Sequence, residues 1–210
     1  MTITNSAIKR RILEISYKKR LSHLGSCLTA VDIIKKIYDA KKPDEKFVLS
    51  SGHAGLALYC VLEEKGGKNA ESIFDHHGVH PDRCSDCGLD CSSGSLGHGL
   101  PIAVGIALAD RTKNVYVLIS DGELAEGSIW EALTIAEKYK LKNLHIHVNL
   151  NGWSALEKTQ TKTLTKRLIT FDLLIYFHKT NVHYLPFLEG LQGHYHVMSD
   201  EDYLYATRVL

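Results

Sequence analysis

Apolar side chains recur at helical spacing near both ends of the chain. Residues 6–20 carry isoleucines at every third or fourth position among Lys and Arg, which predicts an amphipathic helix. The stretch TAVDIIKKIYDA has a second apolar stripe. Asp32, three residues after Thr29, predicts a capping box that begins this helix. The segment MSDEDYLYATRVL predicts a helix at the other end of the chain.

The next part of the chain alternates apolar runs with turn residues. KFVLS at 46–50 predicts a strand, and SGHAGLALYCVLEEKGG predicts a helix that ends at Gly66 and Gly67. Residues 72–99 are rich in Gly, His, Cys, Ser and Asp and predict a long loop, which in a compact domain is commonly functional. The helix expected in GHGLPIAVGIALADR is apolar on nearly all sides, so we expect it to be buried.

A strand, a helix and a second strand then follow in direct succession. NVYVLIS and NLHIHVNL are apolar runs of strand length, and GSIWEALTIAEKYK between them has a helical pattern. This order predicts a parallel βαβ unit with a right-handed crossover. LITFDLLIYFH at 168–178 predicts a further strand. We therefore expect an α/β fold, a three-layer sandwich in which helices flank a mainly parallel sheet, formed by residues 1–210 as a single domain.

Polar side chains follow both strands of the predicted βαβ unit. Asp121 and Asn151 stand about 30 residues apart, so in a parallel unit both lie at the same edge of the sheet, where ligands bind. Two oxygen ligands from adjacent loops suit Mg²⁺ completed by diphosphate oxygens and water. Gly122 allows the backbone to approach a phosphate closely. Asp-Gly and Asn-Gly are also common turn pairs, and two ordinary turns remain the alternative.

Composition and charge narrow the class of protein. Lys and Arg total 25 against 24 Asp and Glu, for a net charge of +1, which indicates neither a nucleic-acid partner nor a membrane surface. GLPIAVGIALA is too short an apolar run to span a bilayer, and the N-terminal segment lacks the apolar core of a secretory signal. Five cysteines, an odd number, do not suggest an extracellular disulfide framework, so we expect a cytoplasmic protein.

Three cysteines lie close together in CSDCGLDC, with histidines on the N-terminal side. A structural zinc ion is one interpretation of this cluster. Its candidate ligands are Cys84, Cys87, Cys91, His76, His77 and His80. The spacing is irregular and the second half of a regular zinc motif is missing from the sequence, so the pattern favours cysteines that bind no metal.

Several ordered motifs together resemble the thiamine diphosphate-binding half of transketolase. The cofactor motif of that family begins Gly-Asp-Gly and ends in Asn, and here it reads SDGELAEGSIWEAL…VNLNGW. FVLSSGHAGLALYCVL resembles the Ser-x-Gly-His segment of the family. VHPD and GLDCSSGSLGHGLPIAVGIALA resemble its His-Pro-Glu and Gly-Ser-Leu-Gly-Gln-Gly elements. The resemblance covers nearly all of residues 7–160 and resumes at about 183–204.

The resemblance implies thiamine diphosphate and Mg²⁺ as cofactors and assigns a role to each matching residue. The implied metal ligands are the side chains of Asp121 and Asn151 and the carbonyl oxygen of Trp153. The implied cofactor contacts are His53, Gly94, Ser95, Leu96, Asp121, Gly122, Glu123, Asn151 and Trp153. The implied catalytic residues are His23, His53, His80, His194 (with His196 as a near alternative) and Glu126, which would join a carboxylate network reaching the partner chain. The imidazoles would move protons to and from substrate hydroxyls.

The chain also departs from the family pattern. Ser120 replaces the first glycine of the cofactor motif, and Ser22 precedes His23 where glycine is usual. Between about 156 and 183 the chain is much shorter than its family. The pyrimidine-type domain, which in this family supplies the glutamate that activates the cofactor, is absent. The resemblance therefore implies a separate partner polypeptide, in a heterodimer or heterotetramer.

The implied function is that of the cofactor-binding subunit of a two-chain, transketolase-like transferase that moves a two-carbon ketol unit between sugars. One alternative is the α chain of a 2-oxo acid dehydrogenase or acyloin-forming enzyme, although SSGHAG and HPD are not expected there. A second alternative is a non-catalytic diphosphate-binding remnant, suggested by the shortened C-terminal region. The sequence leaves open which sugars react and whether they are phosphorylated or nucleotide-linked.

Overall fold

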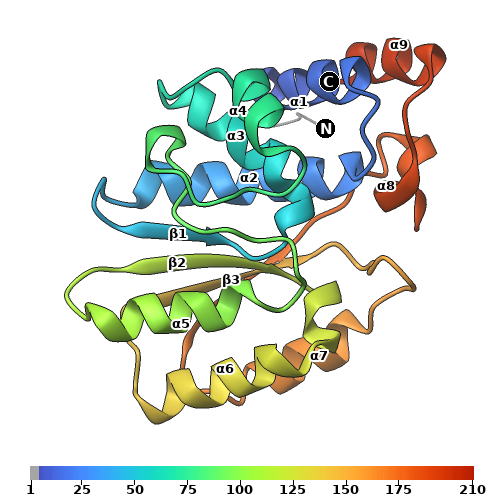
Figure 1. The fold of residues 1–210 in the computed structure, drawn as a ribbon. Coiled ribbons are helices and arrows are strands. Elements are labelled where there is room, and N and C mark those ends of the chain that lie inside the picture. The colour runs from blue at the N-terminus through green and yellow to red at the C-terminus, as the bar shows by residue number, and fades with distance from the viewer. Residues whose placement is uncertain (1–4) are drawn as a thin grey trace.

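The apolar runs in the middle of the chain form one parallel sheet with helices on both faces (Figure 1). The structure is a computed structural model that describes residues 5–210. Within these residues the sheet has four parallel strands in the order β1-β2-β3-β4. They are β1 (Lys46–Leu49), β2 (Val115–Ser120), β3 (Leu144–Leu150) and β4 (Leu174–Lys179). The predicted three-layer α/β fold is confirmed.

Each face of the sheet buries its own apolar core, because successive strand residues point to opposite faces. In β2, Leu118 belongs to one core, whereas Val117 and Ile119 belong to the other. The first face is covered by α1 (Ser6–Lys18), α2 (Leu24–Ala40), α3 (Gly55–Glu64), α4 (Ala70–His77), α8 (Gln192–Tyr195) and α9 (Asp200–Val209). The second face is covered by α5 (Gly99–Ala109), α6 (Gly127–Lys138) and α7 (Thr161–Leu168).

The predicted capping box of the second helix is wrong. Helix α2 begins at Leu24, so Thr29 lies inside it and donates its hydroxyl proton to the carbonyl oxygen of Ser26. The Asp32 carboxylate instead accepts a hydrogen bond from Lys9 Nζ at 2.7 Å. Asp32 therefore pairs with helix α1 and does not form the predicted cap, and a local sequence pattern cannot show such a contact.

Two further boundaries differ from the sequence-based expectation. The region predicted as a loop over 72–99 is helical as far as His77, where α4 ends. The strand predicted over 168–178 begins only at Leu174, because the residues after α7 form turns. The irregular segment that remains, residues 78–98, runs toward the carboxyl ends of β1 and β2.

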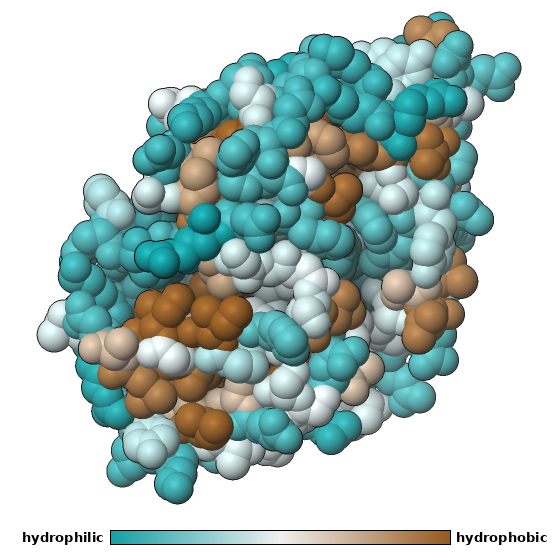
Figure 2. Space-filling model, viewed as in Figure 1, coloured by the Kyte–Doolittle hydropathy of each residue, from teal (hydrophilic) through white to brown (hydrophobic). Residues whose placement is uncertain are grey.

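The prediction that the helix at α5 is buried is wrong for its outer face. Leu100, Ala103 and Ala107 are buried, but Ile102 is 40% exposed and Ile106 is partly exposed. Figure 2 shows an apolar patch in the region where Figure 1 places α5. An apolar surface of this kind is typical of a face that contacts another protein.

The βαβ unit has the predicted parallel arrangement. Strands β2 and β3 pair in register from Val115 with Leu144 to Ser120 with Asn149. The ladder continues past the strand end, where the Asp121 N–H donates to the carbonyl oxygen of Asn149 at 3.0 Å. The loops that carry Asp121 and Asn151 therefore leave the sheet side by side.

A buried carboxylate joins the segments at this edge of the sheet. Glu123 is fully buried. Its Oε1 accepts hydrogen bonds from Ser50 Oγ at 2.6 Å and from Gly97 N–H at 3.1 Å. Its Oε2 accepts from the N–H and hydroxyl of Ser120 at 2.9 and 3.3 Å. One side chain thus links the ends of β1 and β2 to the segment before α5.

A second buried polar pair bridges β3 and β4. His147 Nδ1 lies 2.9 Å from His178 Nε2, and the two rings stack. Burial lowers the pKa of His147 to about 3, and the nearby His178, His145 and Lys36 add to this effect. The pair is therefore neutral in the folded chain at neutral pH.

The described residues include no helix with both the length and the apolar character that crossing a bilayer requires. All five cysteines are unpaired in this part of the chain.

We predict that Glu123→Gln lowers the free energy of unfolding by about 2–4 kcal/mol. The glutamine NH₂ group cannot accept the hydrogen bonds that one carboxylate oxygen now accepts, so buried N–H and O–H groups would face another hydrogen-bond donor. Chemical denaturation at pH 7 measures this difference. Glu131→Gln, at an exposed position on α6, is the matched control and should change stability by less than roughly 0.5 kcal/mol. An equally small effect of Glu123→Gln would show that the network is dispensable.

We also predict a loss of stability in acid that His147 causes. Its pKa is about 3 in the folded chain and about 6.5 in the unfolded chain, so the unfolded state binds an extra proton between these values. The free energy of unfolding then falls as pH drops below 6.5, by up to about 1.4 kcal/mol per pH unit. His147→Gln should remove that contribution in denaturation curves recorded from pH 7 to pH 4. The control His98→Gln, at an exposed histidine, should retain the wild-type slope.

Candidate active site

The carboxyl edge of the sheet borders a cavity of about 220 Å³ in which most of the predicted site residues meet. Strand ends, the amino-terminal end of α2, the segment before α5 and the segment around α8 all contribute to its wall. The lining residues are His23, His53, His80, Leu96, Ser120, Gly122, Asn151, Trp153, Ser154, Ala155 and His194. The sequence therefore identified eight of the lining positions from motifs that are far apart in the chain.

Three histidines form a cluster at one side of the cavity. The ring centroids of His23 and His53 are 5.2 Å apart, and His194 lies 5.9 Å from His23 and 5.7 Å from His53. His23 precedes α2 with a positive φ of 61°, and its N–H donates to the carbonyl oxygen of His194 at 2.9 Å. This turn aims the His23 ring at its two neighbours.

Close backbone packing holds His194 in this cluster. A Cβ atom at Gly25 would lie 2.7 Å from the Cα of Gly193, so the two segments can approach this closely only with glycine at position 25. Ser26 Oγ lies 3.2 Å from His194 Nδ1 and fixes the orientation of the ring. His194, rather than the alternative His196, thus faces the cavity. The His196 side chain instead pairs with Asp202 at 2.8 Å.

The clustered histidines are held in the neutral form. Burial lowers the pKa of His53 to about 3, with smaller contributions from neighbouring histidines. Burial also lowers the pKa of His23 and of His194. His23 Nδ1 is buried without a hydrogen-bond partner among residues 5–210. This arrangement provides neutral imidazoles that can accept or donate a proton at pH 7.

His80 lies at the rim of the cavity, where it packs against a glycine. Gly94 has a φ of 148°, and a Cβ atom there would approach the His80 ring to 3.0 Å. A Cβ atom at Gly52 would in turn lie 2.7 Å from the Gly94 nitrogen. Glycine at both positions therefore lets the segment before α5 lie directly against the residues that follow β1.

The loops after the strand ends carry oxygen atoms that could coordinate a metal ion. Asp121 is 1% exposed, and its Oδ2 accepts hydrogen bonds from Gly152 N–H at 2.9 Å and from the Thr159 hydroxyl. Its Oδ1 is buried and finds no hydrogen-bond partner within the described residues. Burial raises the pKa of the Asp121 carboxyl, although the hydrogen bonds it accepts oppose this effect.

The other candidate oxygen ligands belong to the loop that contacts Asp121, because the Gly152 N–H donates to Asp121 Oδ2 at 2.9 Å. Asn151 Oδ1 accepts from the N–H of Trp153 at 2.9 Å. A Cβ atom at Gly122 would lie 3.1 Å from Ser154 Cα and 3.7 Å from the Trp153 carbonyl oxygen. A buried carboxylate oxygen without a hydrogen bond suits a hard divalent cation, which would balance the charge of Asp121.

Besides Asp121 and Gly94, which are described above, three of the residues predicted to serve the site lie outside the cavity wall. Glu123 is fully buried and binds the chain itself, as described above. Glu126 is exposed and precedes α6. Ser95 is exposed next to Leu96. Glu123 therefore holds together the chain segments that border the site, whereas Glu126 and Ser95 face solvent.

The sequence did not point to several residues of the site. Ser154 and Ala155 line the cavity because they follow the Asn151 motif directly, and this proximity in the chain was an available signal. Ser26 and Thr159 act through contacts with His194 and Asp121. The partners of these two residues are distant in the sequence, so no local pattern reveals them.

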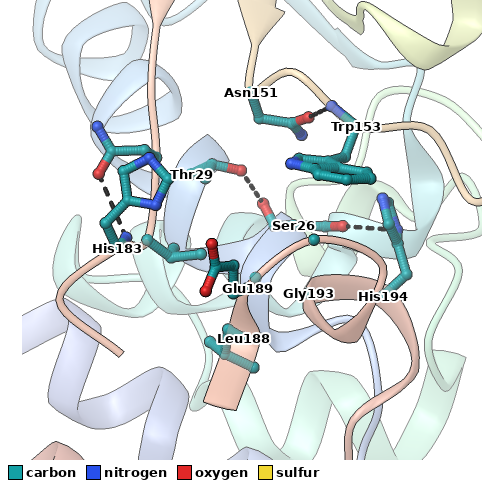
Figure 3. A pocket seen from close by; sticks show the side chains of 13 residues that line it. Ser26, Thr29, Asn151, Trp153, His183, Leu188, Glu189, Gly193 and His194 are labelled. Atoms are coloured by element: carbon teal, nitrogen blue, oxygen red, sulfur yellow. Dashed lines mark hydrogen bonds between the residues drawn. The ribbon is translucent and has the colours of Figure 1, made fainter. Parts of the chain in front are cut away.

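A smaller cavity of about 40 Å³ adjoins the first, and Asn151, Trp153 and His194 line both. Figure 3 shows the Trp153 ring lying between Asn151 and Ser26. A Cβ atom at Gly190 would lie 3.5 Å from this ring. Residues between 181 and 194 therefore form part of the wall of this smaller cavity.

Known proteins share both the sequence and the fold of this chain. The family model described as transketolase, thiamine diphosphate binding domain, matches residues 18–171. A protein of Phocaeicola vulgatus, named as one of the subunits of apulose-4-phosphate transketolase, is 29% identical over 95% of this chain and 90% of its own length. A protein of the same name from Actinobacillus succinogenes is 33% identical over 80% of this chain and 66% of its own length.

A solved transketolase from Campylobacter jejuni has the same fold. It superimposes with a TM-score of 0.71 and 22% identity, over 100% of this chain and 47% of its own length. The chain described here thus spans about half of that protein. The family model matches most of the chain, and the sequence and the fold agree. This chain belongs to the transketolase family and contains its thiamine diphosphate-binding domain.

Proposed function

We propose that this chain is the thiamine diphosphate- and Mg²⁺-binding subunit of a two-chain transketolase-like enzyme, which transfers a two-carbon ketol unit between sugars. The observation that supports this most directly is the free, buried Oδ1 of Asp121, whose Oδ2 accepts a hydrogen bond from Gly152 in the loop after Asn151, at the carboxyl edge of a domain that belongs to the transketolase family. A buried carboxylate oxygen without a hydrogen bond is costly unless a cation balances it.

In this proposal the strand ends hold the metal and the diphosphate. Asp121 and Asn151 supply side-chain oxygens to Mg²⁺, Trp153 supplies its carbonyl oxygen, and phosphate oxygens and water complete the octahedron. Gly122 lets a phosphate approach the backbone, and His53, Gly94 and Leu96 lie along the cofactor. When bound, thiamine diphosphate supplies the nucleophilic carbon and the electron sink of the reaction.

The histidines serve the substrate in this proposal. Sugar hydroxyls must lose and regain protons as carbon–carbon bonds break and form, and an imidazole that is neutral at pH 7 can accept a proton from such a hydroxyl. His23 and His53 are held in that form by burial, which lowers the pKa of each ring. His194 completes the group through its contact with His23. His80, at the rim, faces the path by which substrate enters.

The remaining cofactor contacts come from a partner chain in this proposal. The P. vulgatus relative carries the name of an enzyme subunit, and it is similar to this chain over 90% of its length, which supports a two-chain enzyme. That alignment extends over 254 positions, against 210 residues here, and the proposal places the missing residues at about 156–183. The apolar outer face of α5 (Figure 2) and the exposed Glu126 offer surface for the partner's pyrimidine-type domain.

The substrate in this proposal is a ketose or ketose phosphate. Both apulose-4-phosphate transketolase relatives are named for a phosphorylated ketose. The histidine and serine side chains in the cavity wall suit a polyhydroxylated donor. The partner chain supplies further specificity groups, and together the two chains form a heterodimer or heterotetramer.

We predict Mg²⁺-dependent binding of thiamine diphosphate that requires Asp121 and Asn151. In calorimetric titrations with Mg²⁺, Asp121→Ala or Asn151→Ala should weaken the affinity by more than about 100-fold, since changes even in residues behind metal ligands cost 10- to 100-fold. The wild-type chain titrated with EDTA in place of Mg²⁺ should also bind weakly. Adding the partner chain should tighten binding by the wild-type protein.

The matched control for this titration is Glu157→Ala, an exposed carboxylate two residues beyond the cavity wall. It should bind the cofactor with wild-type affinity. Thermal unfolding of all variants checks that the fold is retained. Failure of the wild-type chain to bind the cofactor, with the partner and without it, would instead support a non-catalytic remnant.

We predict that His80 serves turnover rather than cofactor binding. In the assembled complex, His80→Ala should lower kcat by about 10²- to 10⁴-fold, as expected for loss of a proton-transfer group, while the affinity for thiamine diphosphate stays near that of wild type. Transfer from a ketose donor to an aldehyde acceptor provides the assay. His98→Ala, an exposed histidine, should keep full turnover. An equal loss of cofactor affinity in His80→Ala would assign His80 a structural role.

A further inference from the structure

Three soft metal-binding side chains converge away from the active-site cavity. His77 ends α4, and Cys84 and Cys87 lie in the segment between His80 and α5. One ligand atom of each residue lies within 4.8 Å of the other two. His77 Nε2 is 3.4 Å from Cys87 Sγ. The transketolase motifs account for none of these three side chains.

The distance between two of these ligand atoms is close to that in a tetrahedral metal centre, and all three lie within 4.8 Å of one another. Zinc–sulfur and zinc–nitrogen bonds of about 2.3 and 2.0–2.1 Å place tetrahedral S and N ligands roughly 3.6 Å apart. The observed 3.4 Å between His77 Nε2 and Cys87 Sγ is close to this separation. Thiolate and imidazole ligands together favour zinc over magnesium or calcium.

The backbone between the cysteines presents both sulfur atoms without further rearrangement. Cys84 and Leu89 exchange two hydrogen bonds of 2.9 Å and form an antiparallel bridge. The tight turn between them ends at Gly88, whose φ is 75°. A Cβ atom there would also press on Leu62 at 3.3 Å. Lys68 Nζ borders the group and lies 4.0 Å from Cys87 Sγ.

The other three candidate ligands in this region are turned elsewhere. Cys91 packs in the core on the second face of the sheet, and its Sγ contacts the carbonyl oxygen of Ser92. His80 lines the active-site cavity. The ring of His76 meets the ring of His77 edge-on at 4.5 Å. The structure thus selects a Cys-x-x-Cys pair and one histidine from the irregular sequence cluster.

We propose that His77, Cys84 and Cys87 bind one Zn²⁺ ion, with a water molecule as fourth ligand. This proposal departs from the sequence-based interpretation that the cysteines bind no metal. The ion would join the end of α4 to the turn after His80, so both ends of the short segment that carries His80 would be fixed. The site is separate from the candidate oxygen ligands at Asp121.

The test is the zinc content of the full-length chain, purified after growth with added zinc and washed with EDTA. Elemental analysis should give about one zinc per wild-type chain. His77→Ala, Cys84→Ser and Cys87→Ser should each lower the content at least 10-fold. Cys91→Ser is the matched control from the same motif and should retain zinc. Asp121→Ala should also retain zinc, which separates this site from the proposed Mg²⁺ site.

A measurement on the wild-type chain keeps the test independent of how the variants fold. Chain loaded with Co²⁺ in place of zinc should show thiolate-to-cobalt charge-transfer absorption, and zinc but not Mg²⁺ should abolish it. Three results would overturn the proposal: no zinc or cobalt bound by the wild-type chain, zinc retained in both cysteine variants, or a Cys84–Cys87 disulfide found by mass spectrometry in the freshly purified chain.

Discussion

The buried carboxylate of Glu123 is the constraint on which the active-site edge depends. Removing a charge from water is unfavourable, and burial accordingly raises the pKa of Glu123. The hydrogen bonds it accepts from Ser50, Ser120 and Gly97 offset part of that penalty. His53 follows Ser50 closely, Asp121 follows Ser120, and Leu96 precedes Gly97. The buried side chain of Glu123 therefore fixes the relative positions of the three segments that carry His53, Asp121 and Leu96.

The cavity itself disfavours charge on its own side chains. Burial raises the pKa of Asp121 and lowers the pKa of His53, so each group is shifted toward its neutral form. A bound divalent cation would reverse this preference at Asp121, because its charge would balance the carboxylate. Burial keeps the proposed proton carriers His23, His53 and His194 neutral. The proposed metal site thus requires a charged carboxylate, whereas the proposed proton carriers require neutral imidazoles, and the fold provides both at one edge of the sheet.

Much of this arrangement follows from the sequence because its signals are periodic and local. The apolar runs around Asp121 and Asn151 predict the parallel strands, and the strand ends then place both residues at one edge. The start of α2, the outer face of α5 and the role of Glu123 were not predictable, since each depends on contacts between distant segments. Ile102 is indistinguishable in the sequence from its buried neighbours. The pairing of His77 with the two cysteines likewise depends on where α4 ends.

The contact between Gly25 and Gly193 has a consequence for how the protein is made. These residues are separated by most of the chain, yet the position of His194 depends on their close approach. During synthesis on the ribosome, the strands and Asp121 emerge before His194 does. Because a domain generally folds as a unit, the complete histidine cluster forms only after residue 194 has been synthesised, and a product truncated before it lacks His194 although all four strands are present in its sequence.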